Sequence, residues 1–317
     1  MEISIVIPTY KRPAELKECL NSVIRQTKPP KEILVIDNAD DEASKKIVGE
    51  ISAVAARYVR NEKENSLTGA KNLGAEKASG DIVLFLDDDM TITKNYLEEL
   101  LSVYQTHPEA VGVEGYIEAP NTKLYKFSNL IGRLFFLGHR AENQCRILPS
   151  IKGVYPGSLN SPMNCEWLSG VSSWKKEILA EFKFDENLKK YSDSEDLDFS
   201  YRVYKKYPRG LFITPRALMR NKEAEAGRPA LRELILMAEI YNLYLFYKNF
   251  DQTLKNKLIF LWSRVGKFIF NLLAFVYKLS PNYLKKNVYL VEGWFLAIKH
   301  RKEIKAGNLE FFNKTLR

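Results

Sequence analysis

Three consecutive carboxylates, Asp87, Asp88 and Asp89, directly follow an apolar segment over residues 81–86. Adjacent carboxylates at the end of a buried strand repel one another, so an uncompensated triplet is costly. A divalent cation such as Mg²⁺ or Mn²⁺ offsets this repulsion when it also binds a diphosphate, because hard cations prefer carboxylate and phosphate oxygens. The triplet therefore predicts a cation and diphosphate site, and an acidic turn that caps the next helix is the structural alternative.

A second acidic pair, Glu195 and Asp196, lies at the predicted start of a helix that runs to Tyr207. A carboxylate in such a place can take the proton of a hydroxyl nucleophile. The pair also fits a structural role, because Ser192 and Glu195 have the spacing of a capping box and acids in a first turn favour the helix dipole. The two roles are compatible, since a helix N-terminus also holds a catalytic acid in place.

One basic side chain, Lys71, lies on a helix predicted over residues 68–79. Lys71 can offset the charge of a diphosphate, and Gly74 on the same helix allows close packing against a neighbour. An exposed lysine on an amphipathic helix is the structural alternative. The three histidines are isolated and the three cysteines follow no metal-ligand spacing, so neither set predicts a site and the cysteines are expected to be reduced thiols.

Apolar and amphipathic segments alternate from the start of the chain. Strands are predicted over residues 3–7, 32–36, 56–59, 81–86 and 110–117, and helices over residues 13–25, 41–55 and 68–79. This alternation predicts a mostly parallel, layered α/β sheet, in which ligands bind beyond the carboxyl ends of the strands. Polar clusters follow three of these strands: Pro8-Thr9-Tyr10, Asp37-Asn38 and Asp87-Asp88-Asp89. Residues 118–165 show no clear period, so a long loop region is expected there.

The basic excess of the chain is confined to its C-terminal part. Residues 1–227 contain 32 Lys and Arg against 33 Asp and Glu, whereas residues 228–317 contain 16 against 6, a net charge of +10. This asymmetry predicts two regions, a catalytic domain over residues 1–227 and a basic, aromatic-rich helical region over residues 228–317. No signal-peptide pattern precedes the first strand, so a cytoplasmic chain is expected.

An amphipathic helix is predicted over residues 257–278. At 100° per residue its polar side chains fall within a sector of about 120°, and they are Lys257, Ser263, Arg264, Lys267, Asn271 and Lys278. Charges in mid-helix disfavour a membrane-spanning segment, and a basic polar stripe on an apolar helix favours a helix that lies in the membrane interface.

A further amphipathic helix is predicted over residues 284–301, because polar residues recur there every seven positions. Packing of both helices on the catalytic domain or in a homo-oligomer is the alternative to a membrane surface. A nucleic-acid partner is disfavoured, because the basic residues lie on apolar helices and not in a polar basic patch.

The motifs around the aspartate triplet, taken in order, resemble the family 2 glycosyltransferases, which have the GT-A fold. The segment Ile5–Tyr10 with Arg12 resembles the opening strand and base-binding turn of the family, with Pro8 and Thr9 in that turn. Asp37-Asn38 resembles the second-strand aspartate that contacts the nucleobase. Lys71 takes the place of an arginine in a segment that usually reads Ala-Arg-Asn-x-Gly, and Gly80–Asp89 resembles the strand that leads into the DXD motif.

On the acceptor side, Trp167-Leu-Ser-Gly170 and the following Trp174, Phe184-Asp185-Glu186 and Glu195-Asp196 resemble further family segments. The resemblance implies that Asp196 is the catalytic base. The chain departs from the family pattern where a histidine metal ligand often occurs, because Arg220 or Asn221 holds that place. Arg220 can bind diphosphate charge directly, and the cation is then left to Asp89, Asp87 and phosphate.

The resemblance implies a GT-A, Rossmann-like α/β sandwich with a C-terminal helical extension. It implies a sugar transfer from a nucleoside-diphosphate sugar, with UDP-sugars first, to a hydroxyl of a glycan or lipid-linked acceptor, by inverting single displacement. Mg²⁺ or Mn²⁺ is the expected cofactor, and the cytoplasmic face of a membrane is the expected location. A non-catalytic, membrane-associated nucleotide-sugar-binding protein is the alternative, and Asp196 argues against it.

Overall fold

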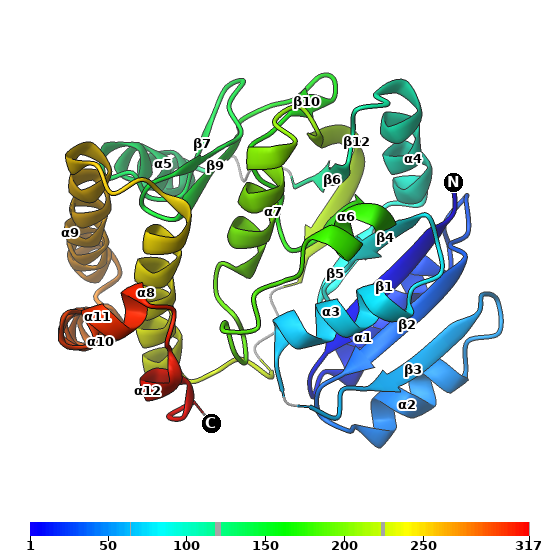
Figure 1. Cartoon of the computed structure of the whole chain (residues 1–317), viewed down its shortest axis with the longest axis horizontal. Helices are drawn as coiled ribbons and strands as arrows, with labels where there is room; N and C mark the ends of the chain where they lie inside the picture. Colours follow the sequence, from blue (N-terminus) through cyan, green and yellow to red (C-terminus); the bar gives the residue numbers. More distant parts are fainter. Residues whose placement is uncertain (64, 118–121, 223–225, 317) are drawn as a thin grey trace. The chain divides into compact units, whose positions relative to one another are not determined.

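The computed structural model describes residues 1–63, 65–117, 122–222 and 226–316. Contacts group them into two compact units. The first unit comprises residues 1–118, 158–190 and 199–228, and the second comprises residues 119–157, 191–198 and 229–317. Figure 1 shows the elements along the chain.

The first unit is built on one mixed sheet. Its strands are β1 (Ile3–Thr9), β2 (Glu32–Asp37), β3 (Ala56–Arg60), β4 (Ile82–Phe85), β5 (Met90–Ile92), β6 (Gly112–Tyr116), β10 (Met163–Asn164), β11 (Ser172–Lys175) and β12 (Leu211–Asn221). Their order is β10-β12-β6-β11-β4-β1-β2-β3, with β5 paired to β12. Strands β4, β1, β2 and β3 are parallel, as predicted, whereas β11 runs antiparallel to both of its neighbours.

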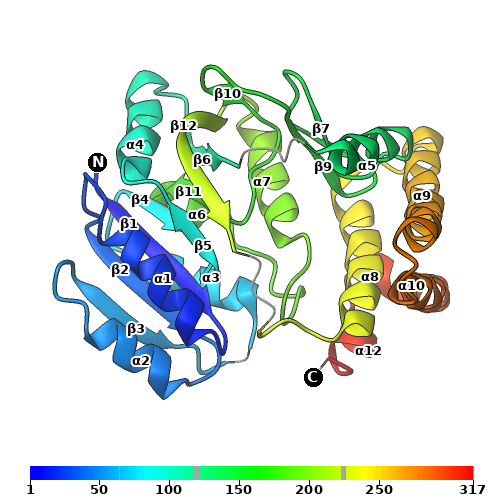
Figure 2. The ribbon, with the colours of Figure 1, turned by 180° about the vertical axis from the view of Figure 1, so that it is seen from behind.

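Helices cover both faces of this sheet. They are α1 (Pro13–Val23), α2 (Glu42–Gly49), α3 (Leu67–Lys77), α4 (Tyr96–Thr106) and α6 (Lys176–Glu181), with α7 (Glu195–Lys206) shared between the units. Figures 1 and 2 show α3 and α6 over one face and α1 and α4 over the other. Pro13 opens α1 at a position where its missing N–H costs nothing, and Ser66 caps α3 by accepting from the backbone N of Gly69 at 3.3 Å.

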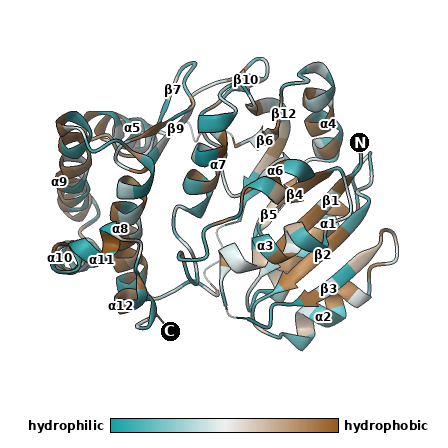
Figure 3. Cartoon of the chain, viewed as in Figure 1, coloured by the Kyte–Doolittle hydropathy of each residue, from teal (hydrophilic) through white to brown (hydrophobic). Residues whose placement is uncertain are grey.

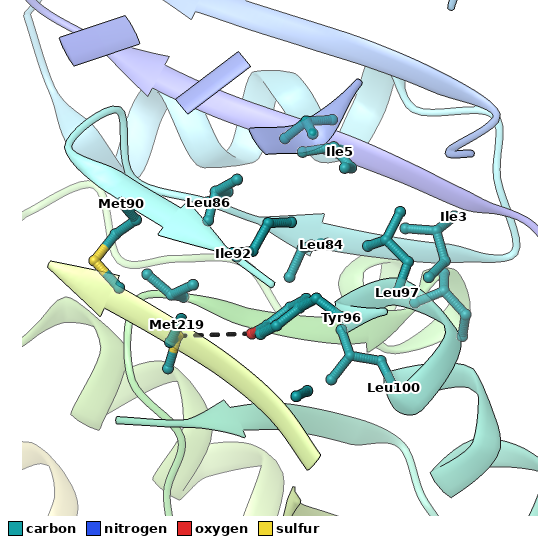
Figure 4. Packing of buried hydrophobic residues seen from close by; sticks show 14 of the residues in the cluster. Ile3, Ile5, Leu84, Leu86, Met90, Ile92, Tyr96, Leu97, Leu100 and Met219 are labelled. Atoms are coloured by element: carbon teal, nitrogen blue, oxygen red, sulfur yellow. Dashed lines mark hydrogen bonds between the residues drawn. The ribbon is translucent and has the colours of Figure 1, made fainter. Parts of the chain in front are cut away.

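The core of the first unit lies between the sheet and helix α4. Tyr96 is fully buried there beside Leu84, Ile92 and Leu100, and its hydroxyl lies 3.6 Å from the sulfur of Met219 (Figure 4). Side chains from β1, β4, β5, α4 and β12 meet in this cluster. This packing fixes the strand ends that carry the acidic residues.

The prediction of a long loop region over residues 118–165 is wrong for the described part of that range. It contains α5 (Lys123–Leu134), β7 (His139–Ala141), β8 (Arg146–Leu148), β9 (Lys152–Pro156) and β10. The strands β7, β9 and β8 form a separate small sheet in the second unit. Strands this short show no readable period, and only pairing with one another defines them. Residues 118–121 of the predicted loop lie outside the described residues.

Helices make up the rest of the second unit. They are α8 (Leu231–Asn249), α9 (Leu254–Lys278), α10 (Asn282–Lys299), α11 (Arg301–Lys305) and α12 (Glu310–Asn313). The two amphipathic helices predicted from sequence are confirmed as α9 and α10. By length and composition, α9 alone among the described helices could cross a membrane, and 22% of its most apolar 18-residue window is buried. Helix α8 was not predicted, because it is apolar nearly all round and therefore shows no stripe.

Candidate active site

The carboxyl ends of β1, β2 and β4 meet at one edge of the first unit, because these strands are parallel. The register pairs Thr9 with Asp37 across β1 and β2. The backbone N of Asn38 then donates to the carbonyl of Thr9 at 3.0 Å. Asp87, the first residue of the triplet, lies two residues beyond the end of β4. The structure thus confirms that the three polar clusters predicted from sequence share one edge.

Asp88 is the best-connected member of the aspartate triplet. Its side chain accepts from the Thr9 hydroxyl at 2.7 Å and from Arg12 Nη1 at 3.0 Å. The same Arg12 nitrogen lies 3.5 Å from Asp89 Oδ2, and Arg12 Nε donates to the carbonyl of Ala226 at 2.6 Å. Arg12, predicted to belong to a base-binding turn, therefore lies against the acidic run and neutralises part of its charge.

The charge of the triplet is not fully compensated by these contacts. Burial raises the pKa of Asp88 to about 6, although Arg12 and the Thr9 hydroxyl oppose that rise. Burial also raises the pKa of Asp87, with Lys71 and Arg12 opposing and Asp89 adding to the rise. Arg12 and Lys71 are thus the cations that oppose the effect of burial on this turn. Within the part of the chain that the structure describes, no three His, Cys, Asp or Glu side chains are grouped so that they could hold a metal ion.

Arg220 lies on the strand next to the aspartate turn. The antiparallel register pairs Arg220 with Thr91 and Asn221 with Met90. One residue further, the backbone N of Lys222 donates to the carbonyl of Asp89 at 3.0 Å. Arg220 is exposed, so the end of β12 brings an exposed guanidinium to the strand alongside the triplet. This is the place predicted for the missing histidine.

Asp37 shapes the turn that follows β2. It accepts from the backbone N of Ala39 at 2.8 Å, from that of Asp41 at 2.7 Å and from the Tyr58 hydroxyl at 2.6 Å. Burial and the Asp37 carboxylate raise the pKa of Tyr58. The neighbouring Asn38 accepts from the side-chain amide of Asn61 at 2.8 Å. These bonds hold the turn rigid before any ligand arrives.

Tyr10 lies on the turn after β1, where the chain bends sharply. The next residue, Lys11, has a positive φ of 55°, which is uncommon for a residue with a side chain. Its ammonium lies 5.2 Å from the centre of the Tyr10 ring. Pro8 belongs to β1 and pairs with Ile36. The predicted base-binding turn is therefore a strained connection between β1 and α1.

Lys71 is buried, so the exposed-lysine alternative is wrong. Its ammonium donates to the carbonyl of Gly170 at 3.0 Å and lies within 5.6 Å of the ring centres of Phe85 and Phe184. The adjacent Asn72 exchanges two hydrogen bonds with the backbone of Phe184, at 2.9 and 3.0 Å. Helix α3 thereby holds both predicted acceptor-side segments of the first unit. A role of Lys71 toward the diphosphate stays a prediction.

Glu114 is a buried residue of the site that the sequence analysis missed. Its carboxylate accepts from the backbone N of Ser169 at 2.5 Å and from the Ser169 hydroxyl at 2.8 Å. The segment Trp167–Gly170 is also held by Ser200 on α7, whose hydroxyl donates to the carbonyl of Leu168 at 3.3 Å. The available signal was a single glutamate within the apolar strand Gly112–Tyr116, since a buried carboxylate requires partners.

The two tryptophans of the acceptor-side prediction differ in environment. Trp174 is buried, its indole donates to the Ser172 hydroxyl at 3.0 Å, and its ring meets Phe199 edge-on at 4.9 Å. These contacts give Trp174 a packing role in the sheet. Trp167 is half-buried on the segment that Glu114 holds. A contact of either tryptophan with an acceptor stays a prediction.

Glu195 and Asp196 lie in the second unit, at the start of α7. The preceding loop is strained, because Lys190, Ser192 and Ser194 all have positive φ angles between 52° and 66°. Glu195 is buried, whereas Asp196 is half-buried and accepts from the backbone N of Leu197 at 2.8 Å. Strain of this kind persists only where surrounding contacts hold the chain in place.

Those contacts come from α8. Asp198, also in the first turn of α7, accepts from Lys248 Nζ at 3.0 Å and from the Asn249 amide at 2.9 Å. The Ser194 hydroxyl donates to the Asn242 side-chain oxygen at 3.1 Å. All of these groups belong to the second unit. The helical region therefore supports the turn that carries the acidic pair.

A comparison with known families matches residues 4–157 to the model described as Glycosyl transferase family 2. The chain is 31% identical over 136 residues to glycosyltransferase GlyA of Streptococcus pneumoniae, covering 43% of this chain and 18% of that protein. It is 30% identical over 120 residues to a glucosyl-dolichyl phosphate glucuronosyltransferase of Haloferax volcanii, covering 36% and 38%. The chain thus matches well under half the length of either curated relative.

Solved structures support the fold. The structure of S. aureus TarS 1-349 in complex with UDP-GlcNAc has a TM-score of 0.58 at 16% identity, over 98% of this chain and 89% of that one. GalNAc-T7 with UDP, GalNAc and Mn²⁺ has a TM-score of 0.56 at 19% identity, over 78% and 50%. These likenesses confirm the predicted fold class, a mixed α/β sheet of the GT-A type with C-terminal helices α8–α10.

Proposed function

We propose that this chain transfers a sugar from a nucleoside-diphosphate sugar to a hydroxyl acceptor, because residues 4–157 match the model of Glycosyl transferase family 2. The observation that carries the proposal is the shared strand edge in the first unit, where Thr9, Arg12, Asp37 and the aspartate triplet gather. The turn after β2 is held rigid by Asp37, and the acidic turn of the triplet is contacted by Arg12. The two turns together suit a ligand with a base at one end and a diphosphate at the other. UDP-sugars are the first donors to test, since two structural neighbours contain UDP or UDP-GlcNAc.

The proposed reaction is a single displacement with inversion. Asp196 takes the proton of the acceptor hydroxyl, whose oxygen attacks the anomeric carbon while the bond to the diphosphate breaks. The nucleoside diphosphate leaves with that bonding pair. Arg220 lies near the end of β12, on the strand alongside the triplet, and a preorganised cation there stabilises the charge that develops on the leaving group.

A divalent cation fits the triplet by charge and by ligand type. Asp88 is occupied by Thr9 and Arg12, so Asp89 and Asp87 are the residues that would hold Mg²⁺ or Mn²⁺. Their oxygens are the hard ligands that these ions prefer, and a cation would offset the repulsion between neighbouring carboxylates. When bound, such an ion supplies Lewis-acid stabilisation of the leaving diphosphate. The Mn²⁺ in the GalNAc-T7 structure supports this assignment.

A lipid-linked glycan is the proposed acceptor class, on the cytoplasmic face of a membrane. The support comes from the relative named glucosyl-dolichyl phosphate glucuronosyltransferase and from the basic, apolar helices of the second unit. In the first unit, the segment Trp167–Gly170 is the candidate acceptor contact, since Glu114 and Lys71 hold it in place.

The test is a thermal-shift screen of UDP-, GDP- and dTDP-sugars, followed by an assay of sugar release. A ligand that binds only the folded state at 100 times its Kd stabilises it by about 2.7 kcal/mol. UDP-sugars should therefore raise the Tm to a plateau as their concentration increases. The donors that raise the Tm should also be consumed in the assay. A Tm that no nucleotide sugar raises would overturn the proposal, and a shift without any turnover would favour the non-catalytic binding protein.

A further inference from the structure

The middle of the polar stripe of α9 faces the interior of the second unit. Ser263 and Arg264 are buried, and Arg264 Nη1 donates to Glu239 of α8 at 3.2 Å. Lys267 donates to the other Glu239 oxygen at 2.7 Å, and the Trp294 indole of α10 donates to Glu239 at 3.0 Å. One buried carboxylate therefore collects the polar groups of α9 and α10.

The opposite side of α9 is apolar and exposed. Val276 is 69% exposed and Leu254 is 73% exposed, although both are aliphatic. Their spacing follows the turns of the helix, so the exposed side chains form a stripe. The large apolar side chains exposed along α9 are Leu254, Leu258, Leu261, Trp262, Val265, Leu272, Leu273, Val276 and Tyr277.

Helices α5 and α10 carry apolar stripes of the same kind. On α10 the exposed members recur every three or four residues: Leu284, Val288, Val291, Phe295 and Ile298. On α5 they are Phe127, Leu130 and Leu134. Both stripes leave large apolar side chains in water, which soluble proteins usually do only one at a time.

The three stripes border one another because α9 packs against both other helices. The Trp262 indole donates to the carbonyl of Leu134 at 3.0 Å, and Gly266 leaves room for the ring of Phe135. On the other side, the Asn271 amide donates to Asn287 of α10 at 2.8 Å. Figure 3 shows the hydrophobic colour along α5 and α9. We call the exposed residues of the three stripes the apolar face.

Basic side chains flank the apolar face, and acidic ones are nearly absent from its helices. Helix α9 has no acidic residue, and the single one of α10, Glu292, is paired with Arg232. The exposed basic residues at the ends of these helices are Arg133, Lys255, Lys257, Lys278, Lys285 and Lys299, and Arg301 follows α10 at the start of α11. This arrangement complements a surface that is apolar in its interior and negatively charged at its rim.

We propose that the apolar face docks in the interface of a bilayer that contains anionic lipids. Apolar side chains enter the acyl boundary, and the flanking lysines meet the headgroup phosphates. A second copy of this chain fits less well, because two faces with the same basic rim repel each other. A spanning α9 is disfavoured because it would carry Arg264 and Lys267 away from Glu239 into lipid.

The proposed docking surface uses side chains other than those that the sequence predicts for the membrane. The middle of the polar stripe of α9 serves the interior, α5 joins the surface, and the charge toward lipid comes from the helix ends. It does not require transferase activity, and its test contains no catalytic step. The Asp196→Asn variant should therefore bind vesicles as the wild type does.

The test is vesicle flotation of the full chain with phosphatidylcholine alone and with an equimolar mixture of phosphatidylcholine and phosphatidylglycerol. The wild type should float with the mixed vesicles and bind less as salt rises. The variant Val276→Asp/Phe295→Asp should lose roughly tenfold or more in vesicle affinity. Lys255→Gln/Lys257→Gln should lose roughly fivefold for each lysine, and only toward the mixed vesicles.

Leu231→Gln is the matched control, because Leu231 is an exposed apolar residue of α8 outside the apolar face, and it should float like the wild type. Circular dichroism and Tm of every variant establish that it is folded. A wild type that stays in solution with both vesicles overturns the proposal. A second result also overturns it: the wild type self-associates in sedimentation, Val276→Asp/Phe295→Asp abolishes this self-association, and no vesicle binding is seen. The apolar face would then join two copies of the chain.

Discussion

At the scale of single residues, the aspartate triplet divides into different roles. Asp88 is held by Thr9 and Arg12, whereas Asp87 and Asp89 are the proposed cation ligands. Acidic residues at strand ends were predictable, because a strand and the turn after it are contiguous in sequence. The partner of Asp88 was not, since Arg12 lies 76 residues away and only the folded sheet joins them.

The metal assignment predicts a defined response to chelation. Transfer activity should fall in EDTA and return with Mn²⁺, and Asp89→Asn should need a higher Mn²⁺ concentration for half-maximal activity. The physical reason is that Asp89 supplies hard oxygen to the ion. Glu98→Gln, an exposed change on α4, is the control. Full activity in EDTA would contradict the metal assignment. The diphosphate charge would then be offset by basic side chains such as Arg12 and Arg220.

Replacement of the buried Lys71 is expected to lower the stability of the chain. Lys71→Met keeps most of the side-chain length but leaves the carbonyl of Gly170 without that donor, so the free energy of unfolding should fall by about 1–3 kcal/mol. Urea denaturation measures this, with Lys77→Met on the exposed side of the same helix as control. Equal stability of the two variants would show that the buried bond contributes nothing.

At the scale of elements, α8 has two functions in the second unit. Its C-terminal end holds the first turn of α7 through Asp198, and Glu239 in its middle holds α9 and α10. The sequence predicted α9 and α10 from their polar sectors but did not predict α8, because a helix buried on most sides shows no stripe. The direction in which the α9 stripe points was also not predictable, because it depends on Glu239, 25 residues away.

Asn249 is expected to affect catalysis by positioning the turn that carries Asp196. Asn249→Ala removes one of the bonds that hold Asp198, so the turn with Asp196 should lose its fixed geometry and kcat should fall by about tenfold. The Kd of the donor should stay nearly constant, because the donor residues lie in the first unit. Asp251→Asn, an exposed change just beyond α8, serves as the control. A fall in donor affinity with kcat unchanged would contradict this role.

Glu239 predicts a pH dependence of stability. Burial alone would raise its pKa, but Arg264 and Lys267 lower it from an unperturbed 4.5 to about 2. Because the folded-state pKa is depressed, the stabilisation is complete above pH 4.5 and is lost as the pH falls toward 2. The contribution at neutral pH is about 3 kcal/mol.

The variant Glu239→Gln separates this carboxylate from the others. It leaves Arg264 and Lys267 without their counter-charge, so it should destabilise the chain by about 3–5 kcal/mol at neutral pH. Its unfolding free energy should also fall less steeply than that of the wild type between pH 4.5 and 2. Parallel pH profiles from urea denaturation of the two proteins would contradict the account.

At the scale of the whole molecule, the chain combines a mixed α/β sheet, whose residues 4–157 match the model of Glycosyl transferase family 2, with a basic helical region. The predicted boundary after residue 227 stays a prediction, and contacts place residues 119–157 and 191–198 in the second unit. The sequence could show the charge asymmetry but not this grouping, because segments from three parts of the chain form the second unit. The acidic pair and the proposed donor residues thus belong to different units.

The most direct measurement compares wild type, Asp196→Asn and Glu195→Gln for both transfer rate and donor affinity. If Asp196 is the base, its variant should lose between about a hundredfold and ten-thousandfold in kcat, while the donor Kd by calorimetry stays within about twofold, since one uncharged isostere replaces the carboxylate. Unchanged turnover in Asp196→Asn, or the loss of donor binding in that variant, would contradict the proposed glycosyltransferase mechanism.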